Sequence, residues 1–217
     1  MATKEKTRYN LVQDVTNGDL LSAYLVASFD DGLEVLQGND YRLISLQENA
    51  RLRKQEGYQA CISQNGNWVS EDAIYVTNKG KFLTKVSHIA RNAREATQAH
   101  RNGENFYLNE NQVEECLADC VELTRKSVPT NRFGGNGITR YAFGEYAEDY
   151  GKFLKEFGIK EMPIWFTDIQ DKPFARKVWF GRLGDINRSD LRCDWYLCGD
   201  GSRVRGVRYN NGEAAQK

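Results

Sequence analysis

Apolar residues recur at helical spacing in several stretches of the chain, and the clearest start of such a stretch lies at Ser45. Ser45 and Glu48 have the spacing of a capping box, in which each side chain accepts a hydrogen bond from the other residue's backbone N–H. Gly57 closes the pattern, because glycine readily adopts the conformation that ends a helix. The pattern predicts a helix over 46–56.

The segment SHIARNAREATQAH predicts a second helix, with Ser87 as its N-cap. Ile89, Ala93 and Ala96 recur on one side of this helix, so we expect them to face inward.

Two further helices follow from the same periodicity. The first is predicted from one apolar face, which consists of Val113, Cys116, Leu117, Cys120, Val121 and Thr124, and Pro129 ends it. Cys116 and Cys120 would then be small core residues, about 5–6 Å apart at Cβ and too far apart for a disulfide. The second helix is predicted from about Tyr146 to Phe157, with acids in its first turn and lysines near its end, as the helix dipole favours.

Short β-strands are predicted between these helices. Asn65-Gly66 and the stretch from Asn78 to Gly80 are hairpin signals, so we expect an antiparallel meander over about 58–86. Three more strands are predicted toward the C-terminus, with the sequences IWFTD, FARKVWFG and SRVRGVRY. The glycine-rich stretch NRFGGNGITRYAFGE matches no phosphate-binding motif, and we interpret it as a structural turn.

Composition and charge limit the fold class and the partners. The 217 residues are 40% hydrophobic and 12% aromatic, without a repeat or linker, which indicates one α+β domain over 1–217. The formal net charge is zero, so no long-range field attracts nucleic acid or anionic lipid. The sequence shows neither a signal peptide nor a membrane span, which predicts a cytoplasmic protein unless another route displays it.

Motifs for catalysis and metal binding are missing from the sequence. His88 and His100 are the two histidines, and we expect them at the surface or at helix caps. The five cysteines do not indicate a disulfide scaffold, but the C-x4-C pair of Cys193 and Cys198 leaves a metal site or a redox pair open. Apart from that alternative, we expect no catalytic residue, no metal and no cofactor.

The C-terminal segment has a biased set of residue types. From 178 to 212 it contains no Lys, Glu, Gln or Met, although charge is dense there as Asp and Arg. Codons of the form NNC or NNT encode every residue except Lys, Glu, Gln, Met and Trp, and from 185 to 202 only Trp195 falls outside that set. Repeated randomisation of Asn codons at their adenines would produce this pattern, and chance in an ordinary Arg/Asp-rich surface loop is the alternative.

The motif WFGRLG, followed by a Trp and SRVRGVR, resembles the variable repeat of a diversity-generating retroelement target protein. The match extends upstream through PTNRFGGNGITRYAFGE to Pro129, and this block is similar to archaeal variable proteins of such retroelements. The resemblance implies a single-domain C-type lectin-like fold, with short antiparallel strands and several helices, that displays variable side chains for ligand binding. An error-prone reverse transcriptase rewrites the variable repeat in those systems. The sequence lacks the Glu-Pro-Asn motif of calcium-binding lectins and the cysteines of formylglycine-generating enzymes, so neither calcium-dependent sugar binding nor oxidase activity is expected.

The variable segment, about 178–208, divides into anchors and displayed residues. Large apolar residues are expected to anchor it in the core, and these are Trp179, Phe180, Leu183, Trp195 and Val204. The residues between them are expected to vary and to contact the ligand, and these are Asp185, Ile186, Asn187, Asp190, Arg192, Asp194, Tyr196, Cys198, Gly199 and Asp200. Exposed positions away from packed features tolerate change within about 0.5 kcal/mol, so one scaffold can carry many sequences.

We therefore expect a binding module without catalysis, for an unidentified protein or cell-surface ligand, and a monomer without a membrane span. Two alternatives are an altered enzyme of the formylglycine-generating type and a nucleic-acid-binding protein that uses the C-terminal arginines. Nearby Asp residues and the zero net charge count against nucleic acid. We expect the arginines, which are Arg182, Arg203, Arg205 and Arg208, to pair with Asp or with backbone carbonyls instead.

Overall fold

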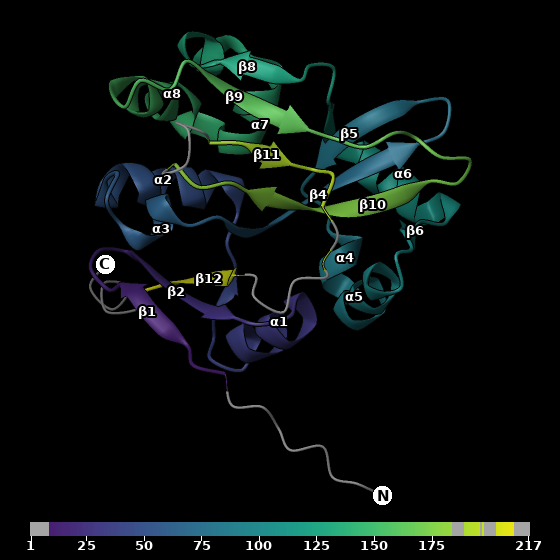
Figure 1. Ribbon diagram of the computed structural model, residues 1–217, viewed down its shortest axis with the longest axis horizontal. Coiled ribbons are helices and arrows are strands. Elements are labelled where there is room, and N and C mark those ends of the chain that lie inside the picture. The colour runs from purple at the N-terminus through teal and green to yellow at the C-terminus, as the bar shows by residue number, and fades with distance from the viewer. Residues whose placement is uncertain (1–8, 184–188, 196, 198–202, 211–217) are drawn as a thin grey trace, which may run out of the picture.

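A computed structural model of the chain describes residues 9–183, 189–195, 197 and 203–210 (Figure 1). The helices are α1 (Phe29–Gln37), α2 (Leu46–Glu56), α3 (Cys61–Gln64), α4 (His88–Arg91), α5 (Ala93–Arg101), α6 (Glu110–Ala118), α7 (Gly137–Phe143) and α8 (Ala147–Glu156), with 3₁₀ turns η1 (Thr130–Gly135) and η2 (Gly144–Tyr146). The strands are β1 (Val12–Val15), β2 (Leu20–Val26), β3 (Arg42–Leu43), β4 (Asn67–Val76), β5 (Gly80–Thr84), β6 (Phe106–Tyr107), β7 (Cys120–Glu122), β8 (Ser127–Pro129), β9 (Glu161–Trp165), β10 (Phe174–Phe180), β11 (Leu191–Arg192) and β12 (Arg203–Tyr209).

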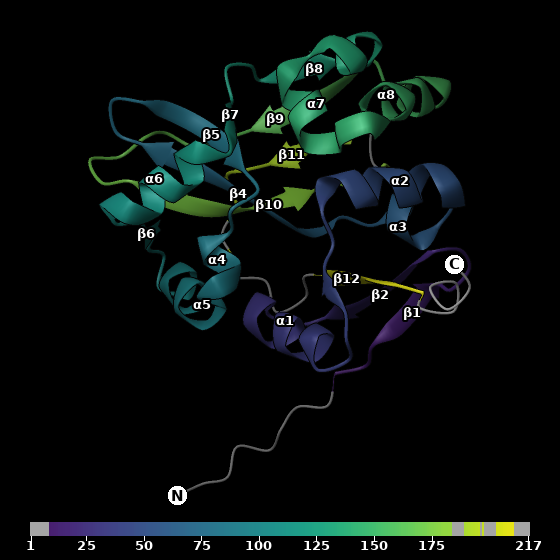
Figure 2. The same ribbon diagram turned by 180° about the vertical axis from the view of Figure 1, so that it is seen from behind.

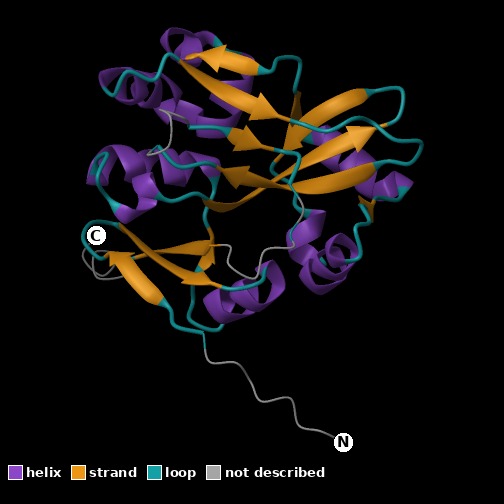
Figure 3. Cartoon of the chain, viewed as in Figure 1, coloured by secondary structure: helices purple, strands orange, loops and turns teal. Residues whose placement is uncertain are grey.

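The strands form a mixed sheet with the order β1-β2-β12-β4-β10-β11-β9-β8, and helices are interleaved with them throughout (Figure 3). β10 lies between β4 and β11, and both pairings are antiparallel, whereas β11 pairs with β9 in parallel. Viewed from behind, helices α2, α7 and α8 lie in front of the β9–β11–β10 part of the sheet (Figure 2). This α+β architecture agrees with the predicted fold class.

Strand β10 separates two apolar cores because its side chains alternate between the sheet faces. Phe174, Val178 and Phe180 join the core that packs against α2, α7 and α8. Ala175 belongs to the other core, which includes residues of α1, α4 and α5, and Trp179 packs against it. The C-terminal segment therefore crosses between the two cores.

Several predicted elements are confirmed. Helix α2 has the full capping box of Ser45 and Glu48 and ends at Gly57. The β4–β5 hairpin turns where predicted, with Asn78 at a φ of 63° and Gly80 at 131°, a left-handed region that these residue types accept. The predicted helix from about Tyr146 to Phe157 is α8, and β10 and β12 fall on the predicted strands FARKVWFG and SRVRGVRY. Strand β9 begins at Glu161 and ends at Trp165, so it shares only Ile164 and Trp165 with the predicted strand IWFTD.

The hairpin predicted at Asn65-Gly66 is wrong. Residues Cys61–Gln64 form helix α3 instead of a strand, and β4 begins directly after the glycine. Gly66 serves close packing, not a turn, because a Cβ there would lie 2.5 Å from Nε1 of Trp179. A glycine needed for contact gives the same sequence signal as a glycine needed for a hairpin.

Two predicted helices and the turn predicted for the glycine-rich stretch differ from the structure. Helix α6 ends at Ala118, and Cys120 starts β7, which pairs with β5, so Cys116 and Cys120 do not share a helical face. The helix predicted from Ser87 breaks at Asn92, whose ψ of 44° is not helical. The glycine-rich stretch is helical as η1 and α7, because the Asn136 side chain accepts hydrogen bonds from two backbone N–H groups and caps α7.

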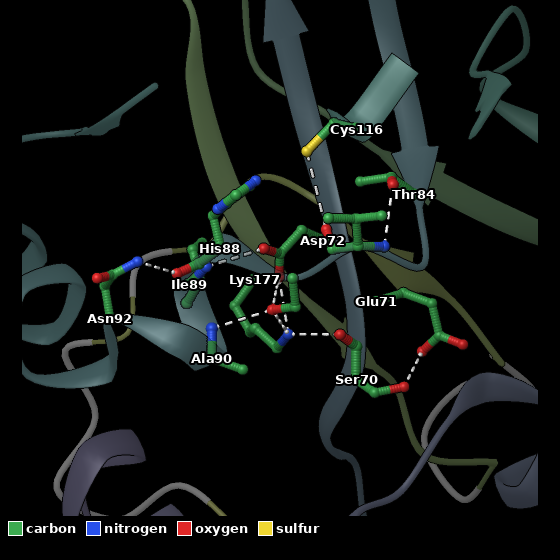
Figure 4. Close-up of polar contacts among 12 residues, drawn as sticks. Ser70, Glu71, Asp72, Thr84, His88, Ile89, Ala90, Asn92, Cys116 and Lys177 are labelled. Atoms are coloured by element: carbon green, nitrogen blue, oxygen red, sulfur yellow. Dashed lines mark hydrogen bonds and ion pairs between the residues drawn. The ribbon is translucent and has the colours of Figure 1, made fainter. Parts of the chain in front are cut away.

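A buried polar cluster fixes α4 to the sheet (Figure 4). The Lys177 ammonium on β10 is fully buried and donates to the Asp72 carboxylate on β4 at 2.7 Å, to Ser70 O at 2.8 Å and to Ser87 Oγ at 2.9 Å. Asp72 also accepts from the Ile89 backbone N–H at 3.1 Å. The two charges are thus compensated, and the N-terminus of α4 is held against β4 and β10.

The expectation that the histidines lie at the surface is wrong. His88 is 5% exposed and His100 is 2% exposed, because α4 and α5 pack these faces against the sheet. His88 lies 3.1 Å from Glu115 of α6.

Candidate ligand-binding face

The main chain of the C-terminal segment is held by groups that lie outside it. The Tyr75 hydroxyl donates to the Cys193 carbonyl at 2.6 Å, and the Cys193 N–H donates to the Trp165 carbonyl at 2.8 Å. The Leu197 N–H donates to Nδ1 of the buried His100 at 3.0 Å. These bonds involve backbone atoms of the segment, so they do not depend on which side chains it carries.

The first half of the segment is anchored by one backbone bond and one side-chain contact to residues outside it. The Leu183 N–H donates to the Ser63 carbonyl at 2.8 Å, and the Tyr150 hydroxyl lies 2.9 Å from Ser189 Oγ in the core. The Gly181 N–H donates to the Asp190 carbonyl at 2.8 Å.

One row of paired residues leads from the core to the surface. The partners across β12, β4, β10, β11 and β9 are Val204, Trp68, Trp179, Arg192 and Trp165. Directly paired residues project from the same face of a sheet. Exposure rises along the row, because Val204 is 0% exposed and Trp68 1%, Trp179 is half-buried, and Trp165 is 40% exposed.

An aromatic and cationic cluster forms at the outer end of this row. The Trp195 ring lies 5.5 Å from the Trp179 ring, and the Arg192 guanidinium lies 4.4 Å from the Trp195 centroid and 5.6 Å from that of Trp165. Such distances are typical of cation–π contacts. Asp194 Oδ1 lies 3.6 Å from Arg192 Nε.

The anchors expected from the sequence do not all lie in the core. Phe180, Leu183 and Val204 are 0% exposed, and Trp179 is half-buried. The placement of Trp195 in the core is wrong: it is 38% exposed, because its ring packs on Trp179 and Arg192 at the surface.

The residues expected to be displayed also differ among themselves. Arg192 and Asp194 are half-buried and reach the surface. The prediction that Asp190 is displayed at the surface is wrong, because this residue is only 8% exposed. A Cβ on Gly181 would lie 1.6 Å from the Asp190 carboxylate. The glycine is what lets that carboxylate pack inward. The other candidates lie outside the described residues, and these are Asp185, Ile186, Asn187, Tyr196, Cys198, Gly199 and Asp200.

One of the arginines of β12, Arg205, has the predicted type of partner, whereas Arg203 pairs with an amide side chain instead. Arg205 is buried and donates to both carboxylate oxygens of Asp14 at 2.7 Å. Arg203 donates to the Asn65 side-chain oxygen. The Arg205–Asp14 contact connects β12 to the edge strand β1.

Two residues of the site were missed at the level of sequence. Trp165 precedes the segment by more than ten positions, and its signal was an aromatic residue on an outward position of the strand IWFTD. His100 lies on α5, and nothing local in the sequence relates it to Leu197.

Burial sets the protonation of the groups around the segment. Desolvation, with the nearby charge of Arg176, lowers the pKa of His100 to about 3, so the ring is neutral and Nδ1 accepts the Leu197 N–H. Burial raises the pKa of the Cys193 thiol, which keeps it protonated and unreactive. Among the described residues no group of three or more His, Cys, Asp or Glu could hold a metal, while Cys198 lies outside them.

The chain has a C-type lectin fold. It is similar over 94% of its length, with a TM-score of 0.64 and 16% identity, to a whole solved chain described as "Accommodation of massive sequence variation in Nanoarchaeota by the C-type lectin fold". No protein-family description and no curated protein matches the sequence. Within the part of the chain that the structure describes, no helix is long and apolar enough to cross a membrane.

Proposed function

We propose that this protein is a ligand-binding scaffold whose C-terminal segment, about 178–208, is diversified by a retroelement to recognise a protein or another macromolecular surface. The observation that carries the proposal is how the segment is held. Tyr75, His100 and Trp165 bind its backbone from outside, whereas Arg192 and Asp194 reach the surface. A rigid frame with exchangeable surface residues is the ordinary arrangement of a binding site.

The residue types of the segment support the same proposal. Several of its buried positions hold apolar side chains such as Leu191 and Leu197, and its bias toward NNC- and NNT-encoded residues is the one that adenine-directed mutation would produce. The C-type lectin fold of the similar solved chain, which is described as accommodating massive sequence variation, is the fold that such a mechanism would use. The proposal includes binding and no catalytic step.

The codons of the segment test this proposal directly. The diversified positions should have codons that end in C or T, and these positions are Asp185, Asn187, Arg192, Asp194, Tyr196 and Asp200. A non-coding template repeat nearby should carry AAC or AAT at most of them, and should match Trp179 and Trp195 unchanged. Sequencing the neighbouring DNA decides the matter: a locus with no template and no reverse transcriptase gene contradicts diversification.

A further inference from the structure

The guanidinium of Arg192 lies close to two exposed indoles. Its carbon lies 4.4 Å from the Trp195 ring centroid on one loop and 5.6 Å from the Trp165 ring centroid on β9. Register fixes this arrangement, because Arg192 of β11 is paired with Trp165 of β9 and with Trp179 of β10. A long, flexible side chain is thus ordered at the surface before any ligand binds.

The edge of this guanidinium is not used within the described part of the chain. No described residue accepts a hydrogen bond from Arg192, and the nearest carboxylate oxygen, on Asp194, is 3.6 Å from Nε, which is too far for one. Nε is buried without a partner, whereas the Arg192 side chain as a whole is 29% exposed. A guanidinium carries five N–H donors in a planar fork that matches a carboxylate, and four of them are on the two terminal nitrogens.

We propose, building on the proposed function, that Trp165, Arg192 and Trp195 form a carboxylate-recognising hot spot whose partner is a protein surface. An Asp or Glu of the partner binds the Arg192 fork in a bidentate manner, and apolar side chains beside it cover the two indoles. Trp165 precedes the diversified segment, so it is a fixed contributor to a face whose other residues change.

The chemistry of the cluster favours a protein over other anions. Trp165 and Trp195 are 40% and 38% exposed, and Trp and Arg are the residue types that most often dominate protein interfaces. A polyanion such as nucleic acid requires several cations in a row, whereas Asp194 places a negative charge beside Arg192.

A library of random peptides on phage, panned on the immobilised full-length protein, provides the probe. Recovered peptides are synthesised and their affinities measured by calorimetry for the parent and for Arg192→Gln, Arg192→Lys and Arg140→Gln. Arg140 is an exposed arginine of α7 and serves as the matched control. We expect Asp or Glu beside aromatic or aliphatic residues in the recovered peptides.

Both substitutions of Arg192 should weaken these peptides at least tenfold, or about 1.4 kcal/mol, since lysine keeps the charge but loses the fork. Arg140→Gln should leave the affinity within about twofold of the parent. Changing the peptide's acid to its amide should lower its affinity for the parent tenfold and leave its affinity for Arg192→Gln almost unchanged. This result would assign the carboxylate to Arg192.

Two results would overturn the inference in distinguishable ways. If Trp195→Ala weakens peptide binding, but Arg192→Gln and amidation of the peptide's acid do not, the carboxylate assignment is wrong and the proposed binding face still stands. If no peptide is recovered, or if binding is unaffected by Trp195→Ala, Asp194→Ala and Arg192→Gln alike, the proposed binding face is contradicted as well.

Discussion

Adjacent residues of the C-terminal segment face opposite environments, because an extended chain alternates its side chains. Leu191 and Cys193 are 0% exposed, while Arg192 and Asp194 between and after them reach the surface. From 191 to 194, the effect of a substitution should therefore follow the position's parity more than its residue type. Trp195 is an exception, because it has the parity of the buried Leu191, Cys193 and Leu197 but is 38% exposed.

Two tryptophans of the same cluster should respond very differently to truncation. Trp68 is 1% exposed, so Trp68→Ala should lower the free energy of unfolding by roughly 3–5 kcal/mol. Trp195→Ala removes mainly the contacts with Trp179 and Arg192, and should cost about 0.5–1.5 kcal/mol. Urea unfolding of both variants measures the difference, and equal losses would show that Trp195 is as essential to the core as Trp68.

His100 should make stability depend on pH in a defined window. Its pKa is lowered from 6.5 to about 3, so the unfolded chain binds a proton as the pH falls through 6.5 while the folded chain does not. The free energy of unfolding therefore falls on acidification by up to about 1.4 kcal/mol per pH unit across that window.

His100→Asn isolates this contribution, because the amide oxygen is an acceptor for the Leu197 N–H that does not titrate. The parent should lose more stability than the variant between neutral and mildly acidic pH, measured by urea unfolding at each pH. Parallel curves for the two proteins would mean that His100 titrates alike in the folded and unfolded states.

At the scale of elements, local signals were reliable where local chemistry decides the structure. The capping box of Ser45 and the hairpin at Asn78 are determined within a few residues, and both were predicted. The second half of the helix predicted through Cys120 failed, since pairing with β5 outweighs helical periodicity there. Trp165 and His100 could not be assigned to the site, because strand register and the packing of α5 bring them to it.

The attachment of α4 to the sheet depends on the Lys177–Asp72 pair. Lys177→Met should lower the free energy of unfolding by about 3–5 kcal/mol, because Asp72 is left as an uncompensated buried charge. Lys152→Met is the control, since Lys152 pairs with Glu148 at the surface and should contribute about 0–1 kcal/mol.

A double variant tests the cause of that loss. Replacing Asp72 with Leu in the Lys177→Met background removes the orphaned charge and should recover part of the stability in chemical denaturation. If the double variant is less stable than Lys177→Met, the loss reflects packing and hydrogen bonding at Ser87 and Ile89 instead of charge.

For the whole molecule, the C-terminal segment is part of both cores. Phe180, Leu183, Leu191 and Cys193 belong to the core beside α2, α7 and α8, whereas Leu197 and Val204 belong to the other one. The resemblance of the C-terminal block led to the correct fold class, but it could not separate Asp190, which packs on Gly181, from Arg192, which is displayed. Asp190 can be buried because Gly181, nine positions earlier, leaves room for its carboxylate.

This division gives a prediction for the segment as a unit. Replacing Asp185, Asn187, Arg192, Asp194 and Tyr196 together with Ser should change the free energy of unfolding by little more than about 0.5 kcal/mol per position, the range of surface substitutions. The anchors Phe180 and Leu191 and the backbone bonds to Tyr75 and His100 remain in that variant. Phe180→Ala alone should cost about 3–5 kcal/mol, a large part of a domain's total stability of about 5–15 kcal/mol. Thermal and urea unfolding of both proteins make the comparison. A multiple variant that unfolds while Phe180→Ala stays intact would mean that the side chains proposed to vary, and not the anchored backbone, hold the segment in place.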